Sequence, residues 1–361
     1  MNYNFLNYLL PDERIAQRPI GKGEARSRSK LLVALPSASQ VTIVDDYYFN
    51  IAKYLQAGDL LVMNKSRVIP ARFFISPDSF GEIEILLLQH ISGEEGVYVQ
   101  HWEALAKPMK RLKEGLVYRL ADELYAKILG RGTNGDKVLI ELCSKSNVHT
   151  VFDLISRFGS MPIPPYIRAG HSDDEDKETY QTIYASDLGS IAAPTAGLHF
   201  TEPLLAKLAT HGVEVHYLTL HVGSSSFLPI RESQIDSHKM SCEYYSISRQ
   251  TARAIEHAKS SGRRIVAVGT TTLRALESYF LLANNDHSEA IKSTNIFITP
   301  GFNFKAVDVL ITNFHQPQST HLLLVAAFSG ANNIEAIYNH ALANDYRFLS
   351  YGDGMILTRL I

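Results

Sequence analysis

Histidines and small polar residues gather in the second half of the sequence. Eleven of the fourteen histidines follow residue 150, so we expect any acid–base chemistry to lie there. The densest segment is 192–202, AAPTAGLHFTE. Its small residues would let a ligand approach the backbone closely, while Thr195 and His199 offer hydrogen bonds or proton transfer. The alternative for this segment is a capped loop with a structural histidine.

A strand is expected at 213–223, VEVHYLTLHVG, and it carries two histidines. Strand alternation places His216 on one face and His221 on the other, so the two cannot bind one metal ion. His221 lies where the strands of open α/β sheets present ligand-binding groups, although a structural role is the alternative. Further along, His238 and Glu243 could form an acid–base or orienting pair, and a surface salt bridge is the alternative.

Two more predicted strands end in polar turns. Residues 265–272, IVAVGTTT, combine a buried strand with a glycine and hydroxyl groups at a helix start, which favours a cradle for an anion or a ribose. Residues 312–320, TNFHQPQST, carry Asn313 and His315 in a similar turn, and Asp353 lies between two glycines. Each feature alone is compatible with ordinary turn chemistry. Together they favour one pocket at the strand ends.

The apolar runs that must position these residues divide the chain into two parts. Between 60 and 142, short alternating runs at close spacing predict the strands of a small barrel or sandwich. After residue 150, helix, glycine and strand alternate, as in α/β domains. We therefore expect a mixed α/β fold: residues 1–70 and 156–361 form a larger α/β body with the active site, and residues 71–155 form an inserted all-β barrel.

Three local predictions accompany this division. The acidic segment 171–177, HSDDEDK, is expected to form a mobile loop, and 295–300, NIFITP, is expected to form a strand. Cys143 and Cys242 are too few for a disulfide framework or a zinc site, and we expect two buried thiols.

The composition limits how the protein could bind a polyanion. Lys and Arg number 35 and Asp and Glu 37, a formal charge of −2, which excludes nucleic-acid binding by bulk charge. A local cluster of Lys107, Lys110, Arg111 and Lys113 in the β segment could clamp an RNA backbone. A solvated basic face is the alternative for that cluster.

The N-terminus and the apolar runs give no sign of export or membrane insertion. The first residues, MNYNFLNYLLPDERIAQ, lack the cationic and apolar regions of a signal peptide. Apolar runs such as 322–328 fall well short of the roughly 20 residues that span a bilayer. We expect a cytoplasmic protein without membrane contact.

A dozen stretches in order, from residue 9 to the C-terminus, resemble the S-adenosylmethionine:tRNA ribosyltransferase-isomerases of queuosine biosynthesis. They include LPDERIAQ, GDLLVMN, RVIPAR, WEALAKPMKRLKEG, GSMPIPPYIR, AAPTAGLHFTEPLL, TLHVG, HKMSCEYY, VAVGTTTLRALES, DVLITNFHQPQST and YRFLSYGDGMIL. The resemblance implies a barrel-centred α/β domain with a smaller inserted β-barrel. It also implies a monomer that needs neither a metal nor a prosthetic group.

The resemblance further implies the reaction. The ribosyl part of S-adenosylmethionine is transferred to the aminomethyl group of 7-aminomethyl-7-deazaguanine at the tRNA wobble position and is isomerised. Epoxyqueuosine-tRNA forms, while adenine and methionine leave.

This chain departs from the family pattern at several positions. Lys65 replaces an acidic residue, Ser160 replaces a histidine and Gln318 replaces an arginine. The run His315-Gln-Pro-Gln-Ser-Thr-His321 also ends in histidine where the family usually has leucine. A lost arginine would weaken a phosphate or carboxylate contact.

The reaction requires a base for the ribose 5′ proton and an acid for the departing adenine. We expect His199 or His221 to be the base, with His315 and Asp353 as acid and orienting group. The residues expected to bind substrate are Arg67, Pro194, Thr195, Ala196, Gly197, Leu198, Phe200, Gly223, His238, Glu243, Gly269, Thr270, Thr271, Thr272, Asn313 and Tyr351.

Two rival functions follow from the same residues. An S-adenosylmethionine-dependent RNA methyltransferase would release S-adenosylhomocysteine, although the sequence lacks a glycine-rich Rossmann motif. A non-catalytic RNA-binding factor would use the β segment and leave the titratable strand ends without a purpose.

Overall fold

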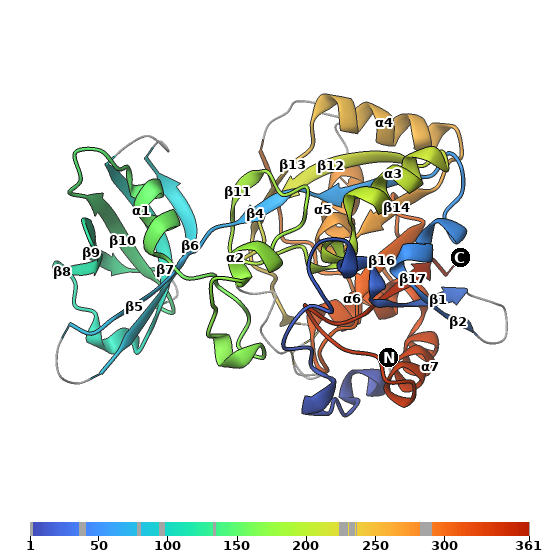
Figure 1. Cartoon of the computed structure of the whole chain (residues 1–361), viewed down its shortest axis with the longest axis horizontal. Helices are drawn as coiled ribbons and strands as arrows, with labels where there is room; N and C mark the ends of the chain where they lie inside the picture. Colours follow the sequence, from blue (N-terminus) through green and yellow to red (C-terminus); the bar gives the residue numbers. More distant parts are fainter. Residues whose placement is uncertain are drawn as a thin grey trace.

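The computed structural model describes residues 3–35, 41–77, 81–93, 98–132, 135–223, 230, 235, 237–281 and 291–360. The chain forms a larger α/β body and a smaller β unit beside it (Figure 1). The predicted mixed α/β class with a smaller barrel is confirmed.

A nine-stranded mixed sheet forms the centre of the body. Its strands are, in sheet order, β15 (Lys292–Thr294), β13 (Glu243–Ser246), β12 (Glu214–Leu220), β3 (Leu60–Asn64), β14 (Ile265–Val268), β16 (Val309–Asn313), β17 (Gly354–Thr358), β1 (Lys30–Leu35) and β2 (Thr42–Tyr47). Strands β12, β3, β14 and β16 run parallel, so their C-terminal ends lie along one edge. A two-stranded parallel sheet of β4 (Ser66–Val68) and β11 (Asp187–Ser190) continues the β3 segment toward the smaller unit.

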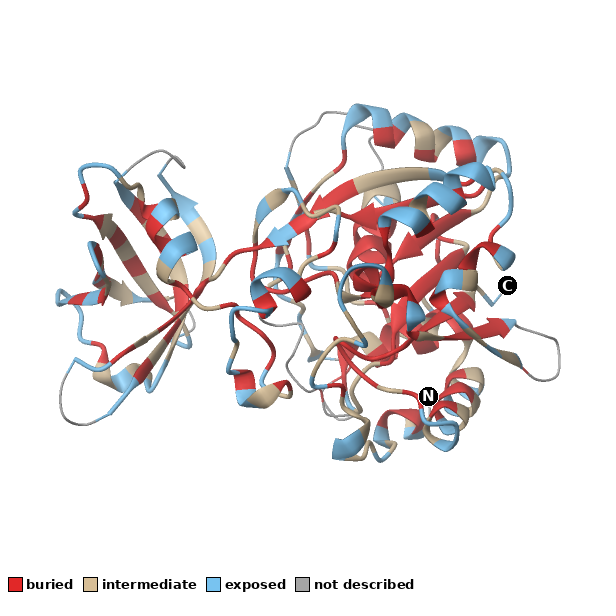
Figure 2. Ribbon diagram, viewed as in Figure 1, coloured by how far each residue is buried: buried red, intermediate tan, exposed pale blue. Residues whose placement is uncertain are grey.

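Both faces of the large sheet are covered, as Figure 2 shows by the buried strands and the exposed outer sides of the helices. On β3, Leu60 and Val62 belong to one apolar cluster, and Leu61 and Met63 belong to another. This alternation explains why the strand reads as a continuous apolar run. Each such fully buried side chain contributes roughly 1.5–3 kcal/mol.

Helices from two parts of the chain supply the covering layers. The Leu60 cluster includes side chains of α4 (Arg249–Ser260), α5 (Thr270–Leu281), α6 (Thr320–Ser329) and α7 (Ala331–Ala343). The Leu61 cluster includes side chains of α3 (Glu202–Thr210) and of the 3₁₀ turn η4 (Tyr48–Lys53). Further 3₁₀ turns are η1 (Asn4–Asn7), η2 (Asp12–Arg14), η3 (Gly23–Arg28), η5 (Met109–Arg111), η6 (Arg168–Gly170) and η7 (Thr195–His199).

The smaller unit is a six-stranded antiparallel sheet. Its order is β5 (Arg72–Ile75), β6 (Ile83–Ser92), β7 (Val99–Lys107), β10 (Val138–Ser144), β9 (Leu124–Arg131) and β8 (Val117–Ala121). The two end strands, β5 and β8, contact each other, so the sheet curls into a nearly closed barrel. Helix α1 (Val151–Phe158) begins at a capping box of Thr150 and Asp153 and buries Leu154 and Ile155 in the barrel core. The limits 71 and 155 of this unit stay a prediction.

Three local predictions are wrong. The acidic segment is not a free loop, because Asp176 begins the short helix α2 (Asp176–Thr179) and is fully buried. Segment 295–300 is not a strand, since β15 ends at Thr294. The cysteines are not both buried: Cys143 is half-buried and Cys242 is exposed. Among the helices in the described ranges, none has the length and apolar character needed to cross a membrane.

Candidate functional site

A pocket opens at the C-terminal ends of β14 and β16, between the first turns of α5 and α6. Gly269 forms the turn from β14 to α5 with a φ of +91°, a conformation that favours glycine. Its N–H donates to the carbonyl of Ile311 on β16, which holds the two strand ends together (2.8 Å). We call this the central pocket; it is lined by Tyr166, Ala192, Ala193, Pro194, Thr195, Ala196, Val222, Gly269, Thr270, Thr271, Thr312, Asn313, Phe314, His315, Gln316, Ser319, His321, Leu349 and Ser350.

Two helix N-termini meet at the central pocket. Thr270 and Thr271 begin α5, and Ser319 caps α6 by accepting the N–H of Leu322 (3.2 Å). The first N–H groups of a helix and its dipole favour a negative group. The geometry therefore suits a ligand with a carboxylate or phosphate at this end of the pocket.

Asn313 is the polar hub on the floor of the pocket. Its amide oxygen accepts the hydroxyl of Thr195 (2.9 Å). Its amide nitrogen faces Nε2 of His199 (3.3 Å) and the carbonyl of Asp353 (3.4 Å). The hub therefore connects the segment 192–199, the end of β16 and the start of β17.

His199 lies behind Asn313 and not in the pocket lining. The imidazole is 4% exposed and stacks on Tyr48, with 4.1 Å between ring centroids. Burial lowers the pKa of His199 to about 3; the nearby Arg347 guanidinium acts in the same direction, whereas a hydrogen bond with the backbone of Arg26 opposes it. His199 is thus a neutral imidazole whose Nε2 accepts from Asn313, which makes it a support for the hub.

Two histidines border the central pocket directly. His315 and His321 stack with 5.2 Å between ring centroids and an 18° interplanar angle. Nε2 of His315 lies 3.2 Å from the hydroxyl of Thr312. Burial and the neighbouring His321 lower the pKa of His315 well below its usual value. Burial, together with Arg274, lowers the pKa of His321 to about 4. Both rings are therefore neutral near pH 7 and can accept a hydrogen bond.

His221 lies beside the pocket, with the neighbouring Val222 in the lining. Its ring packs over Gly189, where a Cβ would come within 3.0 Å. Burial lowers the pKa of His221, and Asp187 opposes that effect. Nδ1 is buried and has no hydrogen-bond partner within the described part of the chain.

Glu243 is a buried carboxylate and not part of a surface salt bridge. Arg274 donates to one of its oxygens, and the N–H of Gly223 donates to the other (3.1 Å). The predicted partner, His238, has its ring beside Phe297, with 5.0 Å between centroids. Glu243 and Arg274 therefore brace the wall on which Val222 lies.

Tyr351 and Asp353 hold the last turn of the body in place. The carboxylate of Asp353 accepts the backbone N–H groups of Lys30 (2.9 Å) and Arg347 (2.8 Å), and burial raises its pKa. Tyr351 donates to the buried carboxylate of Asp176 (3.0 Å). Both residues orient the chain next to Ser350, which reaches the pocket.

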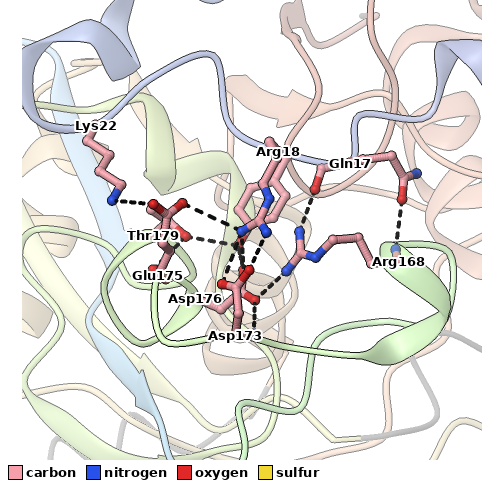
Figure 3. Close-up of polar contacts among 9 residues, drawn as sticks. Gln17, Arg18, Lys22, Arg168, Asp173, Glu175, Asp176 and Thr179 are labelled. Atoms are coloured by element: carbon pink, nitrogen blue, oxygen red, sulfur yellow. Dashed lines mark hydrogen bonds and ion pairs between the residues drawn. The ribbon is translucent and has the colours of Figure 1, made fainter.

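The acidic segment pairs with Arg18 and Lys22 from the N-terminal segment and with the nearby Arg168 (Figure 3). Asp176 accepts from Arg168 and from the N–H of Asp173. Asp173 pairs with Arg18, and Glu175 pairs with Lys22 (3.0 Å). Since Tyr351 also reaches Asp176, this cluster joins the N-terminal segment to the pocket wall.

The structure brings only part of the predicted site residues into the central pocket. Those in the lining are Pro194, Thr195, Ala196, Gly269, Thr270, Thr271, Asn313 and His315. Those outside it are Arg67, Gly197, Leu198, His199, Phe200, His221, Gly223, His238, Glu243, Thr272, Tyr351 and Asp353. Arg67 is exposed on β4, whereas Leu198 and Phe200 belong to the apolar core.

Several lining residues have no clear signal in the sequence. Tyr166 lies in a proline-rich stretch, and Leu349 and Ser350 precede the final strand without a polar motif. His321 is the second residue of the apolar helix α6, where its position resembles that of a core residue. In the sequence, the one sign that His321 belongs to the pocket is that it replaces the leucine usual in the family.

The departures from the family pattern at Lys65, Ser160 and Gln318 are not in the lining of the central pocket. Lys65 pairs with Asp187 (3.0 Å), next to His221. The backbone of Ser160 pairs with Arg72, at the junction of the two units. Gln318 has a φ of 52° and donates its side chain to Asn7 (3.0 Å).

The basic cluster predicted to bind RNA lies on the smaller unit. Lys107, Lys110 and Lys113 are exposed, while Arg111 is half-buried and donates to the carbonyl of Gly81 (2.8 Å). No three histidine, cysteine or acidic side chains in the described ranges gather as a metal ion would require.

Comparisons with known proteins agree with this architecture. The family described as queuosine biosynthesis protein matches residues 3–357. A crystal structure of an S-adenosylmethionine tRNA ribosyltransferase from Thermotoga maritima is 35% identical, with 98% of this chain and 99% of that chain covered and a TM-score of 0.54. This chain belongs to the family of queuosine biosynthesis proteins.

Proposed function

We propose that the protein is an S-adenosylmethionine:tRNA ribosyltransferase-isomerase. It transfers the ribosyl group of S-adenosylmethionine to the aminomethyl nitrogen of a 7-deazaguanine at the tRNA wobble position. A new C–N bond forms, the ribose is rearranged to an epoxycyclopentanediol, and adenine and methionine leave. S-adenosylmethionine is a substrate in this proposal, and no metal or prosthetic group takes part.

The observation that carries the proposal is the composition of the central pocket. Segments 192–196, 269–271 and 312–316 meet there, and each belongs to a stretch that resembles the ribosyltransferase-isomerases. The N-termini of α5 and α6 supply a site for the methionine carboxylate. Pro194, Thr195 and Ala196 line the same pocket, where a nucleoside would contact them.

The geometry supports a division of roles among the predicted catalytic residues. His315 lies in the pocket lining, with Nε2 3.2 Å from the hydroxyl of Thr312, so we assign it contact with the substrate and relay of its proton. His199 and Asp353 hold Asn313 from behind, so we assign them positioning roles. We assign His221 to the pocket wall, next to Val222 in the chain.

The tRNA partner accounts for the basic cluster on the smaller unit. Lys107, Lys110, Arg111 and Lys113 would contact phosphates while the wobble base enters the central pocket. A monomeric state and a cytoplasmic location complete the proposal. Light scattering on the purified protein and fractionation of cells would test these two points.

The reaction products test the function directly. The purified protein is incubated with S-adenosylmethionine and with tRNA that carries the aminomethyl-deazaguanine, and the small products are separated by chromatography. Equal amounts of adenine and methionine that depend on the modified base are expected. S-adenosylhomocysteine would instead indicate a methyltransferase, and tRNA binding without turnover would indicate a binding factor.

Single-turnover measurements test the role of His315. The variant His315→Gln should lose at least about 100-fold in rate, the usual contribution of a general acid or base. His257→Gln, on the exposed side of α4, is the matched control and should keep the wild-type rate. A wild-type rate for His315→Gln would remove it from the chemistry.

A further inference from the structure

The smaller unit has a groove along the line where its barrel fails to close. Strand β5 pairs only with β6, and strand β8 pairs only with β9, among the described strands. Between them lies a hollow of about 910 Å³. We call it the seam groove; it is lined by Phe74, Ile75, Ser76, Pro77, Arg111, Lys113, Leu116, Val117, Tyr118, Arg119, Leu120, Ala121, Asp122 and Phe158.

Charge is distributed unevenly on this unit. Between residues 71 and 155, acidic residues outnumber basic ones by twelve to ten. The lining of the seam groove reverses that balance, with Arg111, Lys113 and Arg119 against the single acid Asp122. The groove is thus a local cationic site on a unit with a net negative formal charge, which suits a polyanion.

The cationic wall of the groove is held rigidly. The hydroxyl of Tyr118 accepts the N–H of Lys113 (3.0 Å) and donates to the carbonyl of Arg111 (3.3 Å). Arg111 in turn donates to the carbonyl groups of Gly81 and Glu82. Because these backbone positions are fixed, an anion can bind there without ordering of the backbone.

Arg119 is held only at the surface. Its ion pair with Asp122 joins two side chains that are 61% and 69% exposed, and such pairs add little stability. A phosphate can therefore replace Asp122 as its partner at small cost.

Apolar and aromatic groups lie between these cations. Leu116 and Val117 are 49% and 59% exposed, so they present apolar surface beside the cations. Phe74 is half-buried and stacks on His171, with 6.2 Å between centroids and a 25° interplanar angle. Flat rings and exposed apolar surface beside cations are the features with which proteins bind unpaired nucleotides.

We propose that the seam groove binds unpaired nucleotides of the tRNA outside the wobble position. Phosphates contact Lys113 and Arg119, and a base packs on the apolar surface of Phe74 and Val117. This inference rests on the proposed function and deepens it. The fold adds Arg119 and Phe74 to the cationic stretch around Arg111, while Lys107 and Lys110 do not line the groove.

Binding of the substrate tRNA, measured by fluorescence anisotropy at several salt concentrations, tests the proposal. Lys113→Glu/Arg119→Glu should weaken binding at least tenfold and reduce the slope of log K against log salt by about 1.4, since two phosphate contacts to a single strand are lost. Phe74→Ala should weaken binding by roughly 5- to 150-fold with an unchanged slope. Lys145→Glu, an exposed lysine of the same unit outside the groove, is the control and should bind like the wild type.

Kinetics separate this proposal from the proposed function. The groove variants should raise KM for tRNA and leave KM for S-adenosylmethionine unchanged. Wild-type affinity and an unchanged salt slope in both groove variants would overturn the groove proposal while the enzyme still works. Absence of ribosyl transfer by the wild type would overturn the proposed function instead. If the charge-reversed protein folds poorly, Lys113→Gln/Arg119→Gln serves instead, because it removes the two charges without introducing new ones. It should also weaken tRNA binding and reduce the salt slope.

Discussion

The neutral, buried state of His199 predicts how stability changes with pH. An exposed histidine has a pKa near 6.5, whereas burial lowers the pKa of His199 to about 3. The folded protein therefore binds no proton at His199 between these values, and the unfolded chain does. The stability that this group contributes is present above pH 6.5 and is lost as pH falls from 6.5 toward 3.

The size of the effect follows from the two pKa values. At pH 5, protonation of this one histidine in the unfolded chain lowers the free energy of unfolding by about 2 kcal/mol, and at pH 7 it lowers it by almost nothing. The figure hardly depends on the folded pKa, as long as that value stays below about 4. His199→Gln removes the ionisable group and also removes the stacking on Tyr48, but the second loss is the same at both pH values.

Urea denaturation at pH 7 and pH 5 measures this difference. Relative to His199→Gln, the wild type should lose about 2 kcal/mol more on going from pH 7 to pH 5. Trp102, the sole tryptophan, lies in the smaller unit, so tryptophan fluorescence reports the unfolding of that unit. Circular dichroism reports both units, and the comparison of the two signals identifies the unfolding transition of the body. His257→Gln corrects for the general effect of removing a histidine. An identical change for wild type and His199→Gln would refute the buried, neutral state.

Two other buried charges give stability predictions. Glu277 accepts the backbone N–H groups of 305–307, so Glu277→Ala should lower the free energy of unfolding by about 3 kcal/mol or more in urea denaturation. Glu277→Gln should lower it less, because an acceptor oxygen remains. Equal losses in the two variants would contradict this account. Arg274→Met should cost about 3–5 kcal/mol, because it leaves the carboxylate of Glu243 buried without its guanidinium, and the double variant Arg274→Met/Glu243→Leu should recover part of that loss in thermal unfolding. Strict additivity in the double variant would show that the two groups do not interact.

The strand ends could be predicted from the sequence because local patterns encode them. A buried β-run followed by glycine and threonines indicates a strand-to-helix turn, and Gly269 indeed lies in such a turn beside Asn313 and His315. In a sheet of parallel strands, the turns that follow the strands all lie at the same edge, so no long-range contact has to be known to group them. For this reason the sequence patterns alone group Thr195, Asn313 and His315, and all three line the central pocket.

The direction of individual side chains could not be predicted in the same way. His199 ends the 3₁₀ turn η7, and whether it points to the pocket or to the core depends on Tyr48, about 150 residues earlier in the chain. The burial of Asp176 has a similar cause, because two of its partners, Arg18 and Tyr351, come from distant segments of the chain. Such long-range pairs leave no periodic signal in the sequence.

The chain enters and leaves the smaller unit at a single place. Arg72 and Ser160 exchange backbone hydrogen bonds of 3.1 and 2.8 Å, and a Cβ on Gly159 would collide with the carbonyl of Pro70. The two chain ends of the unit are therefore already in contact. Such a module can be excised, exchanged with that of a relative or permuted without stretching the body's own chain. Evolution can thus alter what this unit contacts while the strand ends that build the central pocket stay unchanged.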